Sequence, residues 1–234
     1  MKKILVITGG SKGIGRATIA QFMEQDYRVV NLSRSAPDLD GVVQITADMV
    51  NPGWADACAE PLAAELNAAD SICVIHNAAV LKKDSVRDTS ADSLQQVFQL
   101  NVIAALQLNQ LVLPHMKGGS SIIYVGSTLS EKAVAGSCSY VTSKHALVGL
   151  MRATCQDLAG SGIHTACVCP GFTDTEMLRE HLGHDPAILD AIAGGVTQGR
   201  LIQPQEIANT LWFAAQNAVI NGAVLHANLG QIEH

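Results

Sequence analysis

The chain has 234 residues, of which 48% are hydrophobic and 15% are charged. That length suits one domain of ordinary size, and the composition excludes a disordered chain. A net charge of −6 leaves no basic surface for nucleic acid or for an anionic membrane. No apolar run reaches the roughly 18 residues that span a bilayer, and the short apolar start runs into glycines rather than a signal peptide. We therefore predict a cytoplasmic protein without a nucleic-acid or membrane partner.

Seven short apolar runs have the length and composition of strands that are covered on both faces. They are residues 4–8, 28–32, 42–46, 71–75, 121–125, 164–168 and 223–226. Helix-like stretches separate them, at residues 14–25, 54–67, 91–115, 140–159 and 205–216. Pro61 is expected to break the second of these helices, whereas Pro204 suits the first turn of the last one. The alternation predicts an α/β fold over residues 1–234: a single-domain, doubly wound parallel sheet (Rossmann fold) with helices on both faces.

A glycine-rich turn joins the first strand to the first helix. Its backbone would approach a bound ligand through Gly9, Ser11, Lys12, Gly13, Ile14 and Gly15. Glycines allow the tight turn, and the free N–H groups of a helix N-terminus bind a pyrophosphate. A glycine turn alone is weak evidence, but its place between the first strand and the first helix indicates a dinucleotide site.

The end of the second strand indicates which dinucleotide is bound. An acidic residue there would bind the ribose 2′-hydroxyl of NAD, but the strand ends in Asn31, Leu32, Ser33 and Arg34. Arg34 can pair with a 2′-phosphate, and Lys12 adds a second positive charge. A lone loop arginine is often just a solvated side chain; two cations together favour NADP(H) as the cofactor.

Further polar residues follow the later strands, where a doubly wound sheet binds its ligands. Asp48 follows the third strand, Asn77 the fourth, Ser127 the fifth and Thr173 the sixth. Tyr140 and Lys144 are four residues apart in a predicted helix, so they share one of its faces. Asn101 lies inside the long predicted helix of residues 91–115.

The order and spacing of these motifs resemble the short-chain dehydrogenase/reductase superfamily from end to end. The resemblance rests on Thr-Gly-x-x-x-Gly-x-Gly, Asn-Ala after the fourth strand, Tyr-x-x-x-Lys, and the 13 residues between Ser127 and Tyr140. It implies a catalytic tetrad of Asn101, Ser127, Tyr140 and Lys144. Tyr140 would be the general acid or base, Lys144 would stabilise its phenolate, and Ser127 would bind the substrate oxygen. Asn101 would hold, through its backbone, a water that links Lys144 to solvent.

The same resemblance implies the remaining cofactor contacts. Asp48 would contact the adenine edge, with Met49 supplying its backbone, and Asn77 would lie along a ribose. Pro170 and Thr173 would approach the carboxamide or the pyrophosphate. Tyr140 and Lys144 would also touch the cofactor, Lys144 at the nicotinamide ribose. Simpler readings remain open: Asp48 as a helix N-cap, Ser127 as a turn residue, and Asn101 as a cap or kink of its own helix.

The residues therefore predict an NADP(H)-dependent oxidoreductase that interconverts a carbonyl and an alcohol, as a carbonyl reductase does. Residues 199–208 resemble 3-oxoacyl-carrier-protein reductases, which is one alternative. Against it, Gly160, Ser161 and Gly162 stand where that subgroup tends to carry an arginine that docks its acidic carrier. Leu229 also replaces a glycine usual there. The other alternative is a non-catalytic NADP-binding regulatory protein, which would be expected to lose Tyr140, Lys144 or Ser127.

Residues 173–200 are expected to form a lid over a small-molecule substrate, with glycines at 194, 195 and 199 giving hinge freedom. Its apolar residues indicate a mainly hydrophobic substrate, although packing would explain them equally well. They are Phe172, Met177, Leu178, Leu182, Ile188, Leu189 and Ile192. The six scattered cysteines and the histidines lack metal-ligand spacing, so no metal is expected. Related enzymes imply a homodimer or homotetramer.

Overall fold

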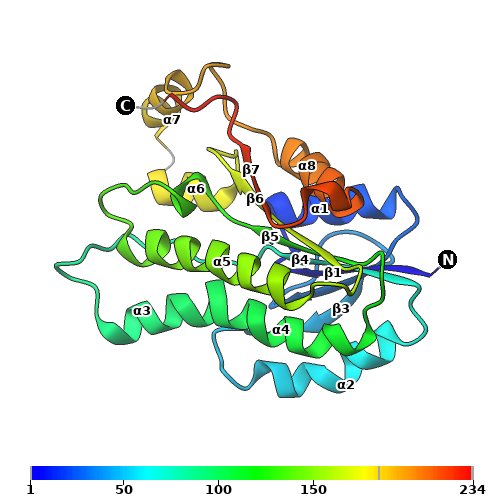
Figure 1. The fold of residues 1–234 in the computed structure, drawn as a ribbon. Coiled ribbons are helices and arrows are strands. Elements are labelled where there is room, and N and C mark those ends of the chain that lie inside the picture. Colours follow the sequence, from blue (N-terminus) through cyan, green and yellow to red (C-terminus); the bar gives the residue numbers. More distant parts are fainter. Residues whose placement is uncertain (1, 184, 233–234) are drawn as a thin grey trace.

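The computed structural model describes residues 2–183 and 185–232. Seven parallel strands form one sheet in the order β3-β2-β1-β4-β5-β6-β7, with helices on both faces (Figure 1). The predicted fold class and all seven predicted strands are confirmed. Their bounds are β1 Lys3–Thr8, β2 Arg28–Ser33, β3 Val43–Thr46, β4 Ser71–His76, β5 Ser121–Val125, β6 His164–Pro170 and β7 Ala223–Ala227.

The helices cover the sheet on two sides, so each strand has two buried faces. On β1, Ile4 and Val6 lie in one hydrophobic core, and the alternate residues Leu5 and Ile7 lie in the other. This is why the strands are apolar throughout instead of alternating. One face is covered by α1 Gly13–Met23 and α8 Pro204–Gln216, and the other by α2 Trp54–Leu66, α3 Ala91–Phe98, α4 Ala104–Val112 and α5 Cys138–Asp157. The helices α6 Glu176–Leu182 and α7 Pro186–Gly194, from the segment that the sequence predicts to be a lid, lie beyond one end of the sheet (Figure 1). They are called the lid helices below.

Helix α2 runs through Pro61 without a break, so the break expected there is wrong. Proline removes one hydrogen bond to the carbonyl four residues earlier. Here that carbonyl belongs to Ala57, and both Ala57 and Pro61 are exposed, so water can solvate the freed group. Trp54, Cys58 and Leu62 on the opposite face are buried and hold the helix against the sheet. Pro204 does begin α8, as predicted.

The long helix predicted at residues 91–115 is one continuous stretch with an irregular middle. Between α3 and α4 lies a π-helical segment, Gln99–Ile103, and a short 3-10 turn, Leu113–His115, follows α4. By length and composition alone, Ala91–His115 would suffice to cross a membrane. Val97, Leu108 and Val112 from this stretch are, however, fully buried inside the protein. Its apolar character therefore serves the core.

A chain of buried hydrogen bonds ties two strands to two helices. The Nε2 of His76 on β4 donates to Asn109 Oδ1 (2.8 Å), and Asn109 Nδ2 donates to the hydroxyl of Tyr124 on β5 (2.7 Å). That hydroxyl lies 3.0 Å from Thr154 Oγ1 on α5. His76 Nδ1 has no hydrogen-bond partner among the described residues. Burial, opposed by the Asn109 hydrogen bond, lowers the pKa of His76 from 6.5 to about 4.

This depressed pKa predicts a specific acid sensitivity. Between pH 6.5 and about 4 the unfolded chain binds a proton at His76 that the folded chain refuses, so stability falls as the pH falls. In His76→Gln the glutamine amide replaces the imidazole N–H as a hydrogen-bond donor, but it does not titrate. The variant therefore lacks the loss of folding free energy that His76 causes, which is about 2 kcal/mol at pH 5. Denaturant unfolding at pH 7.5 and pH 5 should therefore show a smaller pH effect in the variant than in the wild type. His145→Gln, an exposed histidine on α5, is the control; equal pH effects in wild type and His76→Gln would contradict the assignment.

The glycine turn between β1 and α1 brings two backbone segments into direct contact. Gly9 and Gly13 have φ of 68° and 57°, which disfavours any residue with a side chain. A Cβ at Gly15 would lie 2.3 Å from the carbonyl oxygen of Gly9 and 2.6 Å from Asn77 Nδ2. Helix α1 therefore approaches the turn at Gly15 too closely for any side chain.

Gly15→Ala is expected to open this contact and destabilise the protein by about 2 kcal/mol or more, the cost of overpacking rigid backbone. Gly149→Ala in α5 is the matched control, because a Cβ there meets no atom within 4 Å. Alanine in place of a helical glycine should leave stability unchanged or raise it by up to about 1 kcal/mol. Thermal unfolding of both variants measures the difference; two equal melting temperatures would refute the contact.

Candidate active site

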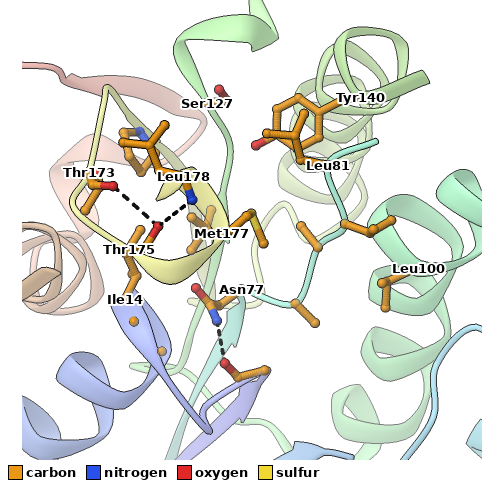
Figure 2. A pocket seen from close by; sticks show the side chains of 18 of the residues that line it. Ile14, Asn77, Leu81, Leu100, Ser127, Tyr140, Thr173, Thr175, Met177 and Leu178 are labelled. Atoms are coloured by element: carbon orange, nitrogen blue, oxygen red, sulfur yellow. Dashed lines mark hydrogen bonds between the residues drawn. The ribbon is translucent and has the colours of Figure 1, made fainter. Parts of the chain in front are cut away.

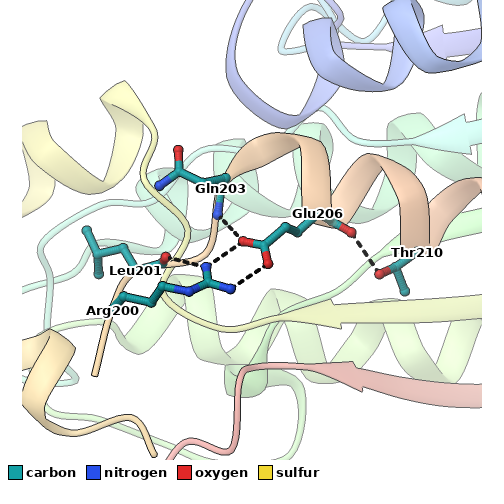
Figure 3. A network of polar contacts seen from close by, with 5 residues as sticks. All are labelled: Arg200, Leu201, Gln203, Glu206 and Thr210. Atoms are coloured by element: carbon teal, nitrogen blue, oxygen red, sulfur yellow. Dashed lines mark hydrogen bonds and ion pairs between the residues drawn. The ribbon is translucent and has the colours of Figure 1, made fainter. Parts of the chain in front are cut away.

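A cavity of about 850 Å³ opens beyond the carboxyl ends of the strands, between the glycine turn, α5 and the lid helix α6 (Figure 2). It gathers almost every residue that the sequence singled out. The lining includes Gly9, Ser11, Lys12, Gly13, Ile14, Gly15, Arg34, Asp48, Met49, Asn77, Ser127, Tyr140, Lys144, Pro170 and Thr173. Asn101 does not line it.

The floor of the cavity is a rigid set of hydrogen bonds around the glycine turn. The Thr8 hydroxyl accepts from the backbone N–H groups of Asn77 and Ala78, each at 3.0 Å. Asn77 Nδ2 donates back to the carbonyls of Thr8 and Gly9 at 3.0 and 2.9 Å. Figure 2 shows the Asn77 side chain pointing at the glycine turn. The N–H of Gly10 donates to Asn31 Oδ1 (2.9 Å). This role of Asn31 was not predicted, although a polar residue within an apolar strand was a signal for it.

The two cations of the predicted cofactor site have different surroundings. Arg34 is exposed at the cavity and makes no ion pair or hydrogen bond within the described residues. Lys12 is ion-paired with Glu176, the first residue of α6. This lid contact was not predicted; an acid at the first turn of the lid helix was its only signal in the sequence.

Asp48 and Met49 lie at the same end of the cavity as Arg34. Asp48 is exposed, and its carboxylate accepts one weak hydrogen bond within the described residues, from the N–H of Val50 at 3.4 Å. Helix α2 begins at Trp54 with Gly53 as its N-cap, so the N-cap reading of Asp48 is wrong. Asp48 therefore remains open to contact a ligand.

Tyr140, Lys144 and Ser127 meet at the other end. Lys144 is only 3% exposed, and its ammonium donates to the carbonyl of Val125 at 2.7 Å. The same ammonium lies 5.5 Å from the centre of the Tyr140 ring. Ser127 begins a 3-10 turn, and its hydroxyl oxygen accepts from the N–H of Leu129 (3.1 Å). It is thus a turn residue, as the simpler reading had it, but its hydroxyl proton remains available, and Figure 2 shows it near the Tyr140 ring.

Asn101 lies behind this group, in the π-helical segment, and is 3% exposed. Its side chain accepts from the N–H of Val80 (2.9 Å) and donates to the Val80 carbonyl (3.1 Å) and to Ser143 Oγ (2.9 Å). Ser143 Oγ in turn donates to the carbonyl of Tyr140 (2.8 Å). These partners are 21 and 42 residues away, so Asn101 does not cap its own helix. A π-helical segment also frees backbone carbonyls from regular pairing, which suits a water-binding carbonyl.

Two cysteines press on the turn that carries Ser127. Cys167 and Cys169 are buried free thiols on one face of β6, as predicted, with their sulfurs 3.8 Å apart. A Cβ at Gly126 would lie 2.7 Å from both sulfurs. The close packing fixes the backbone between Val125 and Ser127. No group of three or more potential metal ligands occurs in residues 2–183 and 185–232.

The lid splits into a part that lines the cavity and a part that does not. Phe172, Met177, Leu178 and Leu182 line it, whereas the residues of α7 do not, so the substrate role expected for Ile188, Leu189 and Ile192 is not supported. Core packing does not account for them either, because no described residue of α7 is buried and Ile188 is 40% exposed. The side chain of Thr175 caps α6, accepting from the N–H of Leu178 (3.3 Å), and packs on Gly13 (Figure 2). Lid and glycine turn are therefore in contact.

Cavity-lining residues that the sequence did not reveal come from the segment after β4, from the helices that flank the cavity and from near the chain end. They include Val80, Leu81, Lys82, Gln96, Leu100, Val134, His181 and Gln231. The chain end is pinned to the segment after α7, because Thr197 N–H donates to the Gly230 carbonyl (3.0 Å). Leu229, which replaces a glycine, keeps a left-handed φ of 51°, a rare conformation for leucine.

Known proteins share this architecture over the whole chain. The model of the family described as short chain dehydrogenase matches residues 3–185. A 2-(R)-hydroxypropyl-CoM dehydrogenase of Xanthobacter autotrophicus is 29% identical, and the alignment covers 96% of both proteins. A 3-oxoacyl-(acyl-carrier-protein) reductase of Escherichia coli is 27% identical over 97% of this chain and 96% of its own.

Among solved structures, a short chain dehydrogenase family protein from Francisella tularensis superposes with a TM-score of 0.88 and 25% identity over 98% of both chains. Two others with the same fold, each 24% identical, are complexes: a 4-hydroxyisoleucine dehydrogenase with NADH (TM-score 0.87) and ElxO with NADP (TM-score 0.85). Each spans 98% of both chains. From the family match and the cavity built on its motifs, the chain belongs to the short-chain dehydrogenase/reductase family of oxidoreductases.

Proposed function

We propose that the protein is an NADP(H)-dependent reductase or dehydrogenase that interconverts a carbonyl and an alcohol, with Tyr140 as the proton donor or acceptor. One observation carries the proposal: Tyr140, Lys144 and Ser127 line the same cavity as the glycine turn. The cradle of the turn fits a dinucleotide, because Gly15 leaves no room for a side chain and helix α1 directs free N–H groups at the cavity. A bound nicotinamide would supply the hydride.

Residues of the chain can donate the proton to the substrate oxygen and stabilise the negative charge that this leaves on Tyr140. In the direction of reduction, the Tyr140 hydroxyl gives its proton to the substrate oxygen, and Ser127 donates a hydrogen bond to the same oxygen. The ammonium of Lys144, buried and close to the Tyr140 ring, stabilises the phenolate that remains. Asn101 fixes the tyrosine helix through Ser143. In this proposal its backbone holds the water through which the proton is resupplied.

The preference for NADP(H) rests on Arg34. Its guanidinium is exposed at the cavity without an acidic partner in the described chain, and no acid ends β2. Lys12 already has Glu176 as a partner and therefore supports the preference less than the sequence suggested. Arg34 supplies the charge that a 2′-phosphate needs.

Reduction of a carrier-bound 3-oxoacyl chain is the second candidate, favoured by the Escherichia coli relative. The stretch before β6 has glycines where that subgroup tends to place its docking arginine, which speaks against it. A non-catalytic regulatory protein fits less well, because such a protein has no need of Tyr140, Lys144 and Ser127 together.

Tyr140→Phe tests the chemistry. The change removes one oxygen, so folding and cofactor binding should survive while turnover falls by about 10²- to 10⁴-fold, the usual contribution of a positioned proton donor. A screen of small ketones and aldehydes for NADPH consumption first identifies a substrate. Single-turnover reduction at saturating NADPH then compares the variant with the wild type, with Tyr27→Phe, a tyrosine outside the cavity lining, as the control. If the Tyr140 variant kept more than half the wild-type rate, the mechanism would be refuted.

Arg34→Ala tests the cofactor. Loss of a charge-assisted contact to phosphate costs about 1.5–3 kcal/mol, so NADPH should bind roughly ten- to a hundred-fold more weakly, with NADH little affected. Equilibrium titration of both cofactors by fluorescence gives the ratio of the two affinities. Arg152→Ala, an exposed arginine on α5 outside the cavity, serves as the control. An unchanged ratio in Arg34→Ala would remove the basis for NADP(H).

A further inference from the structure

Beyond Tyr140, one wall of the cavity is apolar, and Lys82 lies at the margin of this wall. Figure 2 shows Leu81 beside the Tyr140 ring, with Leu100 on the same side and Met177 of the lid helix extending toward them. Leu81, Leu100 and Met177 all line the cavity, and so does Lys82, the residue directly after Leu81. A group that reacts at Tyr140 therefore has apolar surface next to it and a lysine beyond.

Lys82 is held in place by neutral oxygens. It is half-buried, and its ammonium donates to Ser93 Oγ (3.0 Å) and to Gln96 Oε1 (3.4 Å). No carboxylate within the described residues lies in ion-pair distance of it. The nearest acid in the sequence, Asp84, accepts hydrogen bonds from the N–H of Ser139 (3.0 Å) and the hydroxyl of Thr89 (3.2 Å). The charge of Lys82 is among the causes that lower the pKa of Asp84, after the hydrogen bonds from Ser139 and Thr89. Lys82 thus presents an oriented positive charge that a carboxylate senses but does not contact as an ion pair.

The lid brings a further polar group to the same side. Leu178, His181 and Leu182 are three and four residues apart on α6 and line the cavity together, as one helix face does. Partial burial and then the charge of Lys83 lower the pKa of His181. Lys83 is the residue directly after Lys82, and Lys82 and His181 line the same cavity. The lid helix and the segment after β4 therefore face each other across this margin.

We propose that the substrate is an amphipathic carbonyl compound with an anionic group, an oxo acid, and that Lys82 binds its carboxylate. His181 donates a hydrogen bond to the same group, while Leu81, Leu178 and Leu182 contact the hydrocarbon between the carboxylate and the carbonyl. This assignment rests on the proposed function and narrows its substrate class. Lys82 donates only to neutral oxygens, and a substrate carboxylate would be a stronger acceptor. Charge-assisted hydrogen bonds are about twice as strong as neutral ones.

The test compares acids with their esters. 4-Oxopentanoate and 5-oxohexanoate, each beside its methyl ester, are reduced with NADPH, and kcat/KM is measured. The wild type is expected to prefer the acid of at least one pair by about tenfold or more, and Lys82→Gln to abolish that preference, as loss of a charge-assisted contact predicts. Arg87→Gln removes one charge from the same exposed loop outside the cavity and should keep the preference. A wild type that prefers the esters, or an equal loss of preference in both variants, overturns the assignment.

A binding measurement separates this inference from the proposed reaction. Calorimetric titration of 4-oxopentanoate into the protein with NADP⁺ forms a complex that cannot turn over. Weaker binding in Lys82→Gln than in Arg87→Gln supports the carboxylate site even if no ketone is reduced, an outcome that would defeat only the proposed reaction. Reduction of the esters without preference for the acids would leave the reaction standing and defeat the carboxylate site. If the protein neither reduces these compounds nor binds 4-oxopentanoate, both the proposed reaction and the carboxylate site are refuted.

Discussion

The buried ammonium of Lys144 needs hydrogen-bond acceptors, and the carbonyl of Val125, at the last residue of β5, meets it at 2.7 Å. A buried charge without such a partner would be strongly destabilising, so this contact fixes α5 against the end of the sheet. The positions of Tyr140 and Ser127 both depend on this contact between Lys144 and Val125. Tyr140 lies one turn earlier on the same helix, and Ser127 lies two residues beyond Val125. Gly126 between them leaves no room for a side chain, because a Cβ there would lie 2.7 Å from the sulfurs of Cys167 and Cys169 on β6.

At the glycine turn, the other end of the cavity, the contact between turn and lid helix is weak enough for a ligand to replace it. The ion pair of Lys12 with Glu176 is more than half exposed, and exposed pairs contribute about 0–1 kcal/mol. A phosphate can therefore take Lys12 from Glu176 at little cost, which would loosen the lid where it meets the glycine turn. The hydrogen bonds beneath, from Thr8 to Asn77 and Ala78, remain buried and fixed. A rigid floor under an exchangeable lid suits a cofactor that enters and leaves in each turnover.

By itself, the sequence determined the architecture and predicted many of the residues that line the cavity. Each strand is apolar on both faces, because both faces are buried, and this local pattern is legible without the fold. Parallel strands place their carboxyl ends at one edge, so residues that follow strands had to converge. Arg34, Asp48 and Ser127 could be assigned to one cavity on this ground, because a shared edge needs only the topology and not the detailed packing. Tyr140 lies within a helix, and the family resemblance assigned it to the same cavity.

The tertiary structure decided what depends on partners distant in the chain. Helix α2 continues through Pro61 because its opposite face is buried against the sheet, which local propensity could not reveal. Asn101 reaches residues 21 and 42 positions away, so its bonding had no local signal. Lys12 found an acid 164 residues further on, and Lys82 found only neutral oxygens. The partner of a charged side chain is set by which segments meet in space, and only the folded chain brings those segments together.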